Sequence, residues 1–212
     1  MRWVIKFDWI DFGRSAKEPK QATASVDKLA HTSTASLLAE FLRRRDAPFN
    51  KVFCWLRRDD GVLETSPATS TGVRLVEMTF PFAAYEKSGA DRLAIFADWL
   101  VRAVAAGAPE LGINDDEAVS LKKRLSERGY SYVRTDKLKR AAGEPRCEVI
   151  YEHSPSNLTV TARCKLPNGQ AVARRFREHP LLRDELSYGR AISKCLIDED
   201  GQITVEPLEG FA

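Results

Sequence analysis

The sequence predicts an α+β fold, with a largely antiparallel sheet or sheets built from hairpins and about three helices packed on one side. Two observations predict it. Strand-like segments come in runs and do not alternate with helical segments, as they would in a doubly wound parallel sheet. Glycine-containing turn sequences separate several of these segments, as hairpins require. The 212 residues form either a single domain or two closely packed lobes, 1–107 and 115–212.

The first third of the chain predicts a strand, a helix and a hairpin. Apolar and polar residues alternate over 2–12, which is the pattern of a strand with one apolar face. Residues 13–31 are polar and predict a loop. Helical spacing of apolar residues predicts a helix over 34–46, ended by Pro48. The turn sequence Asp-Asp-Gly predicts a hairpin over 51–66.

The middle of the chain predicts one strand and two helices. Alternating apolar residues predict a strand over 73–82. Apolar residues at helical spacing predict helices over 89–106 and 116–128, and Asn114 or Asp115 is expected to cap the second one.

The last third of the chain is rich in predicted strands. Segments 130–134 and 146–153 predict single strands, and 157–178 and 190–207 predict two hairpins. The second and third hairpin loops each end in glycine, which suits a three-residue loop with glycine in the left-handed region.

A three-residue loop fixes the register of these two hairpins. It pairs Cys164 with Val172 in one and Ile197 with Ile203 in the other. It also places Arg174 on the apolar face of its strand. Because a buried guanidinium needs partners, we expect Arg174 to contact a carboxylate or backbone carbonyls.

The cysteine pattern predicts neither a disulfide nor a metal site. The four cysteines include no pair at short spacing, and each lies in a strand-like segment: Cys54, Cys147, Cys164 and Cys195. We expect free, buried thiols in a reducing compartment, with no metal and no cofactor. Charged residues interrupt the first apolar stretch, so the sequence predicts a soluble, cytoplasmic protein without a membrane segment.

Charge is distributed unevenly along the chain, whose formal net charge is +3. Segment 122–177 carries fourteen cations and five anions, and segment 178–212 carries eight anions and three cations. The first segment predicts a basic face for an anionic partner. Its candidate residues are Lys122, Lys123, Arg128, Lys137, Lys139, Arg140, Arg163, Lys165, Arg175 and Arg177. An alternative acidic face comprises Asp184, Glu185, Asp198, Glu199 and Asp200.

No residue pattern specifies a catalytic site. His31, His153 and His179 lie apart from one another and from the cysteines, which is typical of structural or exposed histidines. Glu148 and Glu152 fall on one side of a strand, but two solvated glutamates account for this spacing as well as a carboxylate pair does. The sequence therefore favours no catalytic residue.

Two function classes remain open at this point. The first is a non-enzymatic protein-binding module that occludes a partner, of the immunity-protein or antitoxin type, since such proteins act by shape and charge. The second is a nucleic-acid-binding protein or a small nuclease-type enzyme that uses the basic segment 122–177. The expected partner is another protein, such as a toxin or a subunit of a complex; nucleic acid is the alternative, and a membrane is not expected.

Overall fold

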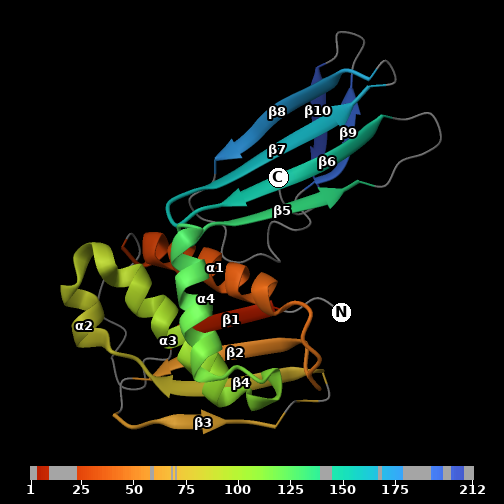
Figure 1. Ribbon diagram of the computed structural model, residues 1–212. Coiled ribbons are helices and arrows are strands. Elements are labelled where there is room, and N and C mark those ends of the chain that lie inside the picture. The colour runs from red at the N-terminus through yellow and green to blue at the C-terminus, as the bar shows by residue number, and fades with distance from the viewer. Residues whose placement is uncertain are drawn as a thin grey trace.

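The chain has an α+β fold with hairpin-built antiparallel sheets, as the sequence predicts (Figure 1). The computed structural model describes residues 4–9, 23–57, 60–67, 69, 71–138, 145–166, 169–178, 192–197 and 202–207.

The first sheet has the strand order β1-β2-β4-β3. Its strands are β1 (Val4–Trp9), β2 (Lys51–Arg57), β4 (Val73–Thr79) and the short β3 (Leu63–Thr65). Strands β1, β2 and β4 run parallel to one another, and β3 runs antiparallel to β4. The predicted hairpin over 51–66 is therefore wrong. A turn sequence shows that the chain reverses there, but it does not decide which strand becomes the neighbour.

Three long helices pack on one side of this sheet, in agreement with the sequence. Helices α1 (Thr23–Leu42) and α3 (Arg92–Gly107) contact the strands, and α4 (Asp115–Glu127) packs on both of them. A short helix α2 (Phe82–Lys87) follows β4, so the predicted strand over 73–82 ends three residues early. The side chain of Asn114 accepts a hydrogen bond from the Glu117 amide at 2.9 Å and caps α4 as predicted.

Helix α1 begins at Thr23, within the segment predicted to be a loop. Its middle turns carry polar residues, yet His31, Thr32, Ser33, Thr34 and Ser36 are all buried. The hydroxyls of Ser33 and Thr34 each donate to the carbonyl of Ala30 at 2.9 Å, so the helix satisfies them itself. The predicted loop is therefore wrong for residues 23–31, where polarity alone misled the prediction, and residues 13–22 lie outside the described part of the chain.

The C-terminal part is an antiparallel meander covered by a hairpin. The meander comprises β5 (Tyr132–Lys137), β6 (Arg146–His153), β7 (Leu158–Lys165) and β8 (Ala171–Glu178). Strands β9 (Ile192–Ile197) and β10 (Ile203–Pro207) form the hairpin. Ile203 and Cys195 pack against side chains from β6 and β7, so the hairpin lies on one face of the meander (Figure 1).

The structure confirms the predicted register of both hairpins next to their loops. Cys164 pairs with Val172, and Ile197 pairs with Ile203. Farther from the loop of the β7–β8 hairpin, a bulge between Val160 and Thr161 shifts the register, so Val160 pairs with Arg177 and the predicted pairing with Phe176 is wrong. Arg174 lies on the face that the β9–β10 hairpin covers, and its Nη1 donates to the Ile203 carbonyl oxygen at 2.8 Å. The expected carbonyl partner for this guanidinium is thus present, but Arg174 is exposed, so the expectation that it is buried is wrong.

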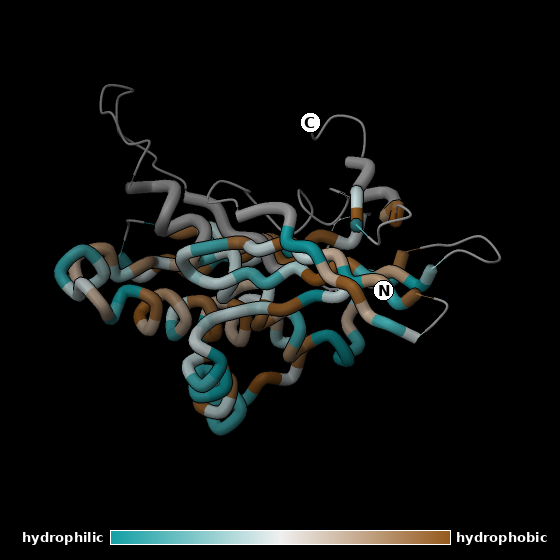
Figure 2. Tube along the Cα trace, turned by 90° about the horizontal axis from the view of Figure 1, so that it is seen from above, coloured by the Kyte–Doolittle hydropathy of each residue, from teal (hydrophilic) through white to brown (hydrophobic). Residues whose placement is uncertain are grey.

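The described apolar residues form separate cores. The larger core lies between the first sheet and its helices, and Leu121 and Leu125 of α4 belong to it. The smaller clusters lie between the meander and the β9–β10 hairpin. Hydrophilic residues collect on peripheral turns and helix ends (Figure 2). No described helix has the length and apolar character that crossing a membrane would require. The choice between one domain and two lobes stays a prediction.

Candidate functional site

A groove of about 1180 Å³ opens at the edge of the first sheet where β2 and β4 end. The register pairs Arg57 with Thr79, the last residues of these strands, so both following segments leave the sheet at the same edge. Residues 60–63 after β2 and 80–84 after β4 line the groove. Ligands of sheets with parallel strands bind outside the carboxyl ends of those strands. The groove therefore lies at the carboxyl ends of two parallel strands, where sheets of this kind can bind ligands.

The floor of the groove is apolar. Met78, Phe82 and Ile113 line it and are only partly buried, although they pack against the larger core. The rings of Phe80 and Phe82 meet edge to face, with centroids 4.9 Å apart. Leu63 of β3 stands at the groove with 50% of its surface exposed. Exposed apolar surface of this kind marks sites that bind partners or ligands.

The rim of the groove is acidic. Asp60, Glu86 and Asp115 line it and are all exposed. Arg102 is the single cation among the described lining residues, and its Nε donates to Asp98 Oδ2 at 2.8 Å. Asp115 also begins the first turn of α4, where carboxylates oppose the positive end of the helix dipole and disfavour an anionic ligand. The groove therefore suits a cationic, partly apolar ligand.

Asp98 joins α3 to α4 beside the groove. Its Oδ1 accepts a hydrogen bond from Lys122 Nζ at 2.8 Å, in addition to the bond from Arg102. Burial by itself would raise the pKa of Asp98, but the hydrogen bond from Lys122 and the charge of Arg102 outweigh it and hold this pKa below its ordinary value. Lys122, assigned to the basic face from the sequence, is thus the ion-pair partner of a carboxylate.

The described residues of the predicted basic face fall into two groups. On or next to α4 lie Lys122, Lys123 and Arg128, and at the far end of the meander lie Lys137, Arg163 and Lys165. The length of β5, roughly 20 Å at about 3.3 Å per residue, separates the groups. Arg175 lies between them on the meander, and its guanidinium donates to Thr159 Oγ1 at 3.1 Å.

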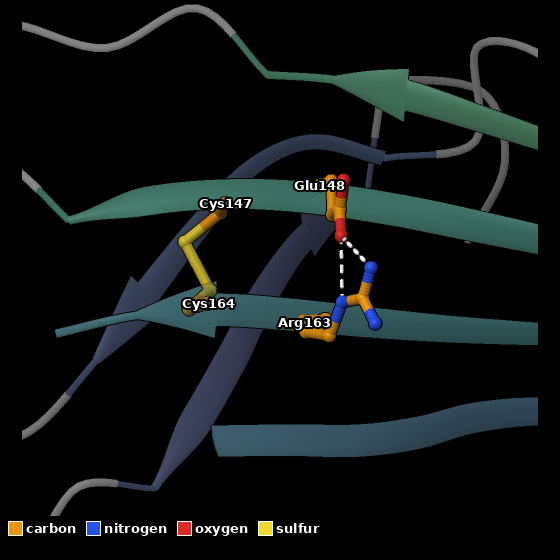
Figure 3. Close-up of a disulfide and its surroundings, with 4 residues drawn as sticks. All are labelled: Cys147, Glu148, Arg163 and Cys164. Atoms are coloured by element: carbon orange, nitrogen blue, oxygen red, sulfur yellow. Dashed lines mark hydrogen bonds and ion pairs between the residues drawn. A yellow bond between two sulfur atoms is a disulfide. The ribbon is translucent and has the colours of Figure 1, made fainter. Parts of the chain in front are cut away.

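The cations at the end of the meander line a second cavity, of about 580 Å³. Lys137, Arg163 and Lys165 line it together with Arg146, which the sequence reasoning missed. Arg146 pairs with Lys165 across β6 and β7, so only the strand register could have revealed it. Arg163 Nε donates to Glu148 Oε1 at 2.6 Å (Figure 3), which makes Glu148 the partner of an arginine and not of Glu152.

Several predicted site residues lie outside the part of the chain that the structure describes. They are Lys139 and Arg140 of the basic face, all five residues of the acidic face (Asp184, Glu185, Asp198, Glu199 and Asp200), and His179. Arg177 lies in β8, but its side chain is not described. Predictions for these residues stay predictions.

The two described histidines lie in the protein interior. His31 is fully buried, its Nε2 lies 2.8 Å from the Tyr85 hydroxyl, and its ring stacks on Phe96 with centroids 4.0 Å apart. Burial lowers the pKa of His31 from its ordinary value to about 3, so the ring is neutral at physiological pH. His153 is also buried, at the end of β6. Neither histidine lines the groove.

The prediction of four free thiols is wrong for two cysteines. Cys147 and Cys164 form a disulfide between β6 and β7, beside the Glu148–Arg163 ion pair (Figure 3). The two strands place them directly opposite each other, with Cα atoms 4.1 Å apart. Seventeen residues separate them in sequence, so only the pairing of the strands brings the sulfurs together. Cys54 and Cys195 are free thiols, and burial raises the pKa of both.

Comparisons of the chain with protein-family models, with curated proteins and with solved structures find no match. The residues and their geometry must therefore carry the functional argument.

Proposed function

We propose that the protein is a non-enzymatic binding module that holds a cationic, partly apolar segment of another protein in the groove at the ends of β2 and β4. By covering that segment it occludes the partner, as an immunity protein or antitoxin does. The observation that supports this proposal is the combination of an apolar floor with an acidic rim.

The two parts of the groove have different roles in binding. Apolar side chains of the partner settle against Met78, Phe82 and Leu63, where burial of a central anchor supplies most of the affinity. Lysine or arginine residues beside that anchor face Glu86 and Asp115, where opposite charge speeds the association. The partner therefore has a basic surface of the kind that binds nucleic-acid phosphates. The proposal requires no cofactor.

Leu63→Arg tests the proposal against a matched control. Leu63 is 50% exposed on β3 at the groove, and Val133 is 56% exposed on β5 outside it. Both substitutions replace an exposed apolar residue of a strand with a cation, so neither opens a cavity in the core. We expect Leu63→Arg to weaken partner binding roughly 30-fold, the equivalent of about 2 kcal/mol for one central anchor. Val133→Arg is expected to bind as the wild type does.

The measurement is capture from native lysate with the tagged wild type, Leu63→Arg and Val133→Arg, each with and without nuclease, followed by titration of the captured protein. Support requires a stoichiometric protein that survives nuclease and that Leu63→Arg alone fails to hold. Equal binding by all three forms would rule out the groove as the binding surface.

Nucleic acid is the second candidate partner, because four cations line the cavity at the end of the meander. Binding to phosphates there predicts an affinity that falls steeply with salt. Arg146→Glu together with Lys165→Glu should then abolish binding of a labelled oligonucleotide, while Leu63→Arg leaves it unchanged. An affinity unaffected by the double substitution would exclude this cavity as a phosphate site.

We also propose a cytoplasmic location. Disulfides that occur in the reducing cytoplasm are mostly transient or redox-active rather than structural. The Cys147–Cys164 disulfide is therefore expected to be partly reduced in cells, and trapping thiols with N-ethylmaleimide at lysis measures that fraction. Complete oxidation in freshly trapped cells would argue for an oxidising compartment.

A further inference from the structure

Three of the four cysteines meet between the meander and the β9–β10 hairpin. Cys147 and Cys164 form the disulfide, and Cys195 of β9 carries a free thiol. The three sulfur atoms all lie within 4.8 Å of one another. Cys195 is 31 positions from Cys164 along the chain, so the packing of the hairpin produces this cluster and sequence spacing does not.

The packing holds Cys195 at the disulfide. Cys195 contacts both of the apolar clusters beneath the hairpin, and one of these clusters contains Cys147 and Cys164. Within the hairpin Cys195 pairs with Val205, and the Arg174–Ile203 hydrogen bond ties β10 to β8 nearby. The thiol therefore keeps its place beside the disulfide for as long as the hairpin stays packed.

We propose that Cys147, Cys164 and Cys195 form a thiol–disulfide exchange site in which the disulfide moves among the three cysteines. The Cys195 thiolate attacks Sγ of Cys147, the Cys195–Cys147 bond forms and the Cys147–Cys164 bond breaks. Cys164 leaves as a thiolate and takes up the proton that Cys195 lost. Attack on Cys164 releases Cys147 in the same way. No external oxidant or reductant takes part, since one disulfide and one thiol are present before and after each step.

The packing around the disulfide favours this chemistry. Cys147 and Cys164 line the cavity at the end of the meander, where Cys147 is half-buried and Cys164 is fully buried. Arg146 and Lys165 line the same cavity, but they alternate with the cysteines along β6 and β7 and so lie on the opposite face of the meander; the closeness of the three sulfurs, and not a nearby charge, favours the exchange. Either new disulfide would link β9 covalently to the meander, whereas the Cys147–Cys164 disulfide leaves the hairpin held by packing and hydrogen bonds alone.

Two single substitutions test whether every pair of the three sulfurs can bond in the folded protein. Cys164→Ser leaves Cys147 with Cys195, and Cys147→Ser leaves Cys164 with Cys195. Because burial raises the pKa of the Cys195 thiol, each purified variant is incubated with oxidised glutathione at pH 8 and at pH 9, and Cys195→Ser serves as the control that retains the original disulfide. We expect both variants to lose two hydrogens in intact mass, with circular dichroism confirming that they stay folded. Folded variants that keep two free thiols, or that only acquire glutathione, would overturn the proposal.

The wild type tests whether exchange occurs without an added oxidant. The folded protein is held at pH 8, alkylated with N-ethylmaleimide before it is unfolded, and digested with trypsin. A basic residue precedes Cys147, Cys164 and Cys195 in each case, so trypsin places the three on separate peptides. We expect some molecules to carry N-ethylmaleimide on Cys147, which is half-buried, and a disulfide between Cys164 and Cys195.

Two results with the wild type would refute the exchange site. One is alkylation of Cys195 alone with the original disulfide retained. The other is a purified protein with three reduced thiols around a bound metal ion, which would assign the cluster to metal binding. Cys54 is the internal control, because burial raises its pKa to about 12 and it should stay unmodified until the protein unfolds.

Discussion

Burial of a neutral His31 predicts that the protein loses stability in mild acid. The pKa of His31 is about 3 in the folded protein, against an ordinary value of 6.5. Between these values the unfolded chain binds a proton that the folded protein excludes, so stability falls as the pH falls from 6.5 towards 3. The slope approaches about 1.4 kcal/mol per pH unit only below pH 6.5, so His31 lowers the free energy of unfolding by about 2 kcal/mol between pH 6.5 and 4.5.

The double variant His31→Phe with Tyr85→Phe isolates this effect. It removes both members of the buried hydrogen bond, so neither the ring nitrogen nor the hydroxyl is left buried without its partner. A phenyl ring at position 31 can still stack on Phe96. The assay is urea unfolding followed by tryptophan fluorescence at pH 6.5, 5.5 and 4.5. Carboxylates titrate in the wild type and in the double variant alike. The difference between the two proteins in how steeply the free energy of unfolding changes with pH therefore reports on His31. Wild type and double variant losing stability in parallel would refute the reasoning.

Two further predictions concern packing and the hairpin. Gly107→Ala should lower the free energy of unfolding by about 1–3 kcal/mol, because its Cβ would lie 2.4 Å from the Val76 methyls and push α3 away from β4. In a double-mutant cycle measured by urea unfolding, Val76→Ala should restore part of this loss, whereas additive losses would contradict the close contact. Arg174→Met removes the hydrogen bond to the Ile203 carbonyl, so it should lower the free energy of unfolding by about 1 kcal/mol and speed amide hydrogen exchange in β10. Arg175→Met, on the opposite face, should change neither. Equal exchange rates in the two variants would argue against the Arg174–Ile203 bond.

The sequence predicted an element correctly where one local pattern, such as apolar periodicity, a helix cap or a glycine-containing loop, was enough to define it. Residues 146–153 form β6 with the predicted bounds, and Asn114 caps α4. The glycine loops set the pairing of Cys164 with Val172 and of Ile197 with Ile203, because a turn type and an apolar face together allow one register.

Prediction failed where a remote partner decides the outcome. The start of α1 was missed because its polar turns are satisfied by the helix backbone and buried by neighbouring elements. The hairpin over 51–66 was wrong because β4 inserts between β2 and β3. No local pattern contains that information.

The candidate sites depend still more on tertiary structure. The groove draws on Leu63, Phe82 and Asp115, which lie in three separate segments of the chain. The basic residues of 122–177 divide between α4 and the far end of the meander, although the sequence gives them as one run. A charge run records composition, and only packing decides which charges share a surface.

Local patterns in the sequence were enough to predict the fold class and the register of two hairpins next to their loops, because these follow from side-chain periodicity and turn chemistry. Tertiary structure alone decided that three strands run parallel, that an acidic, apolar groove opens where two of them end, and that three cysteine sulfurs meet. Each of these depends on contacts between segments far apart in the chain, which local propensity does not encode.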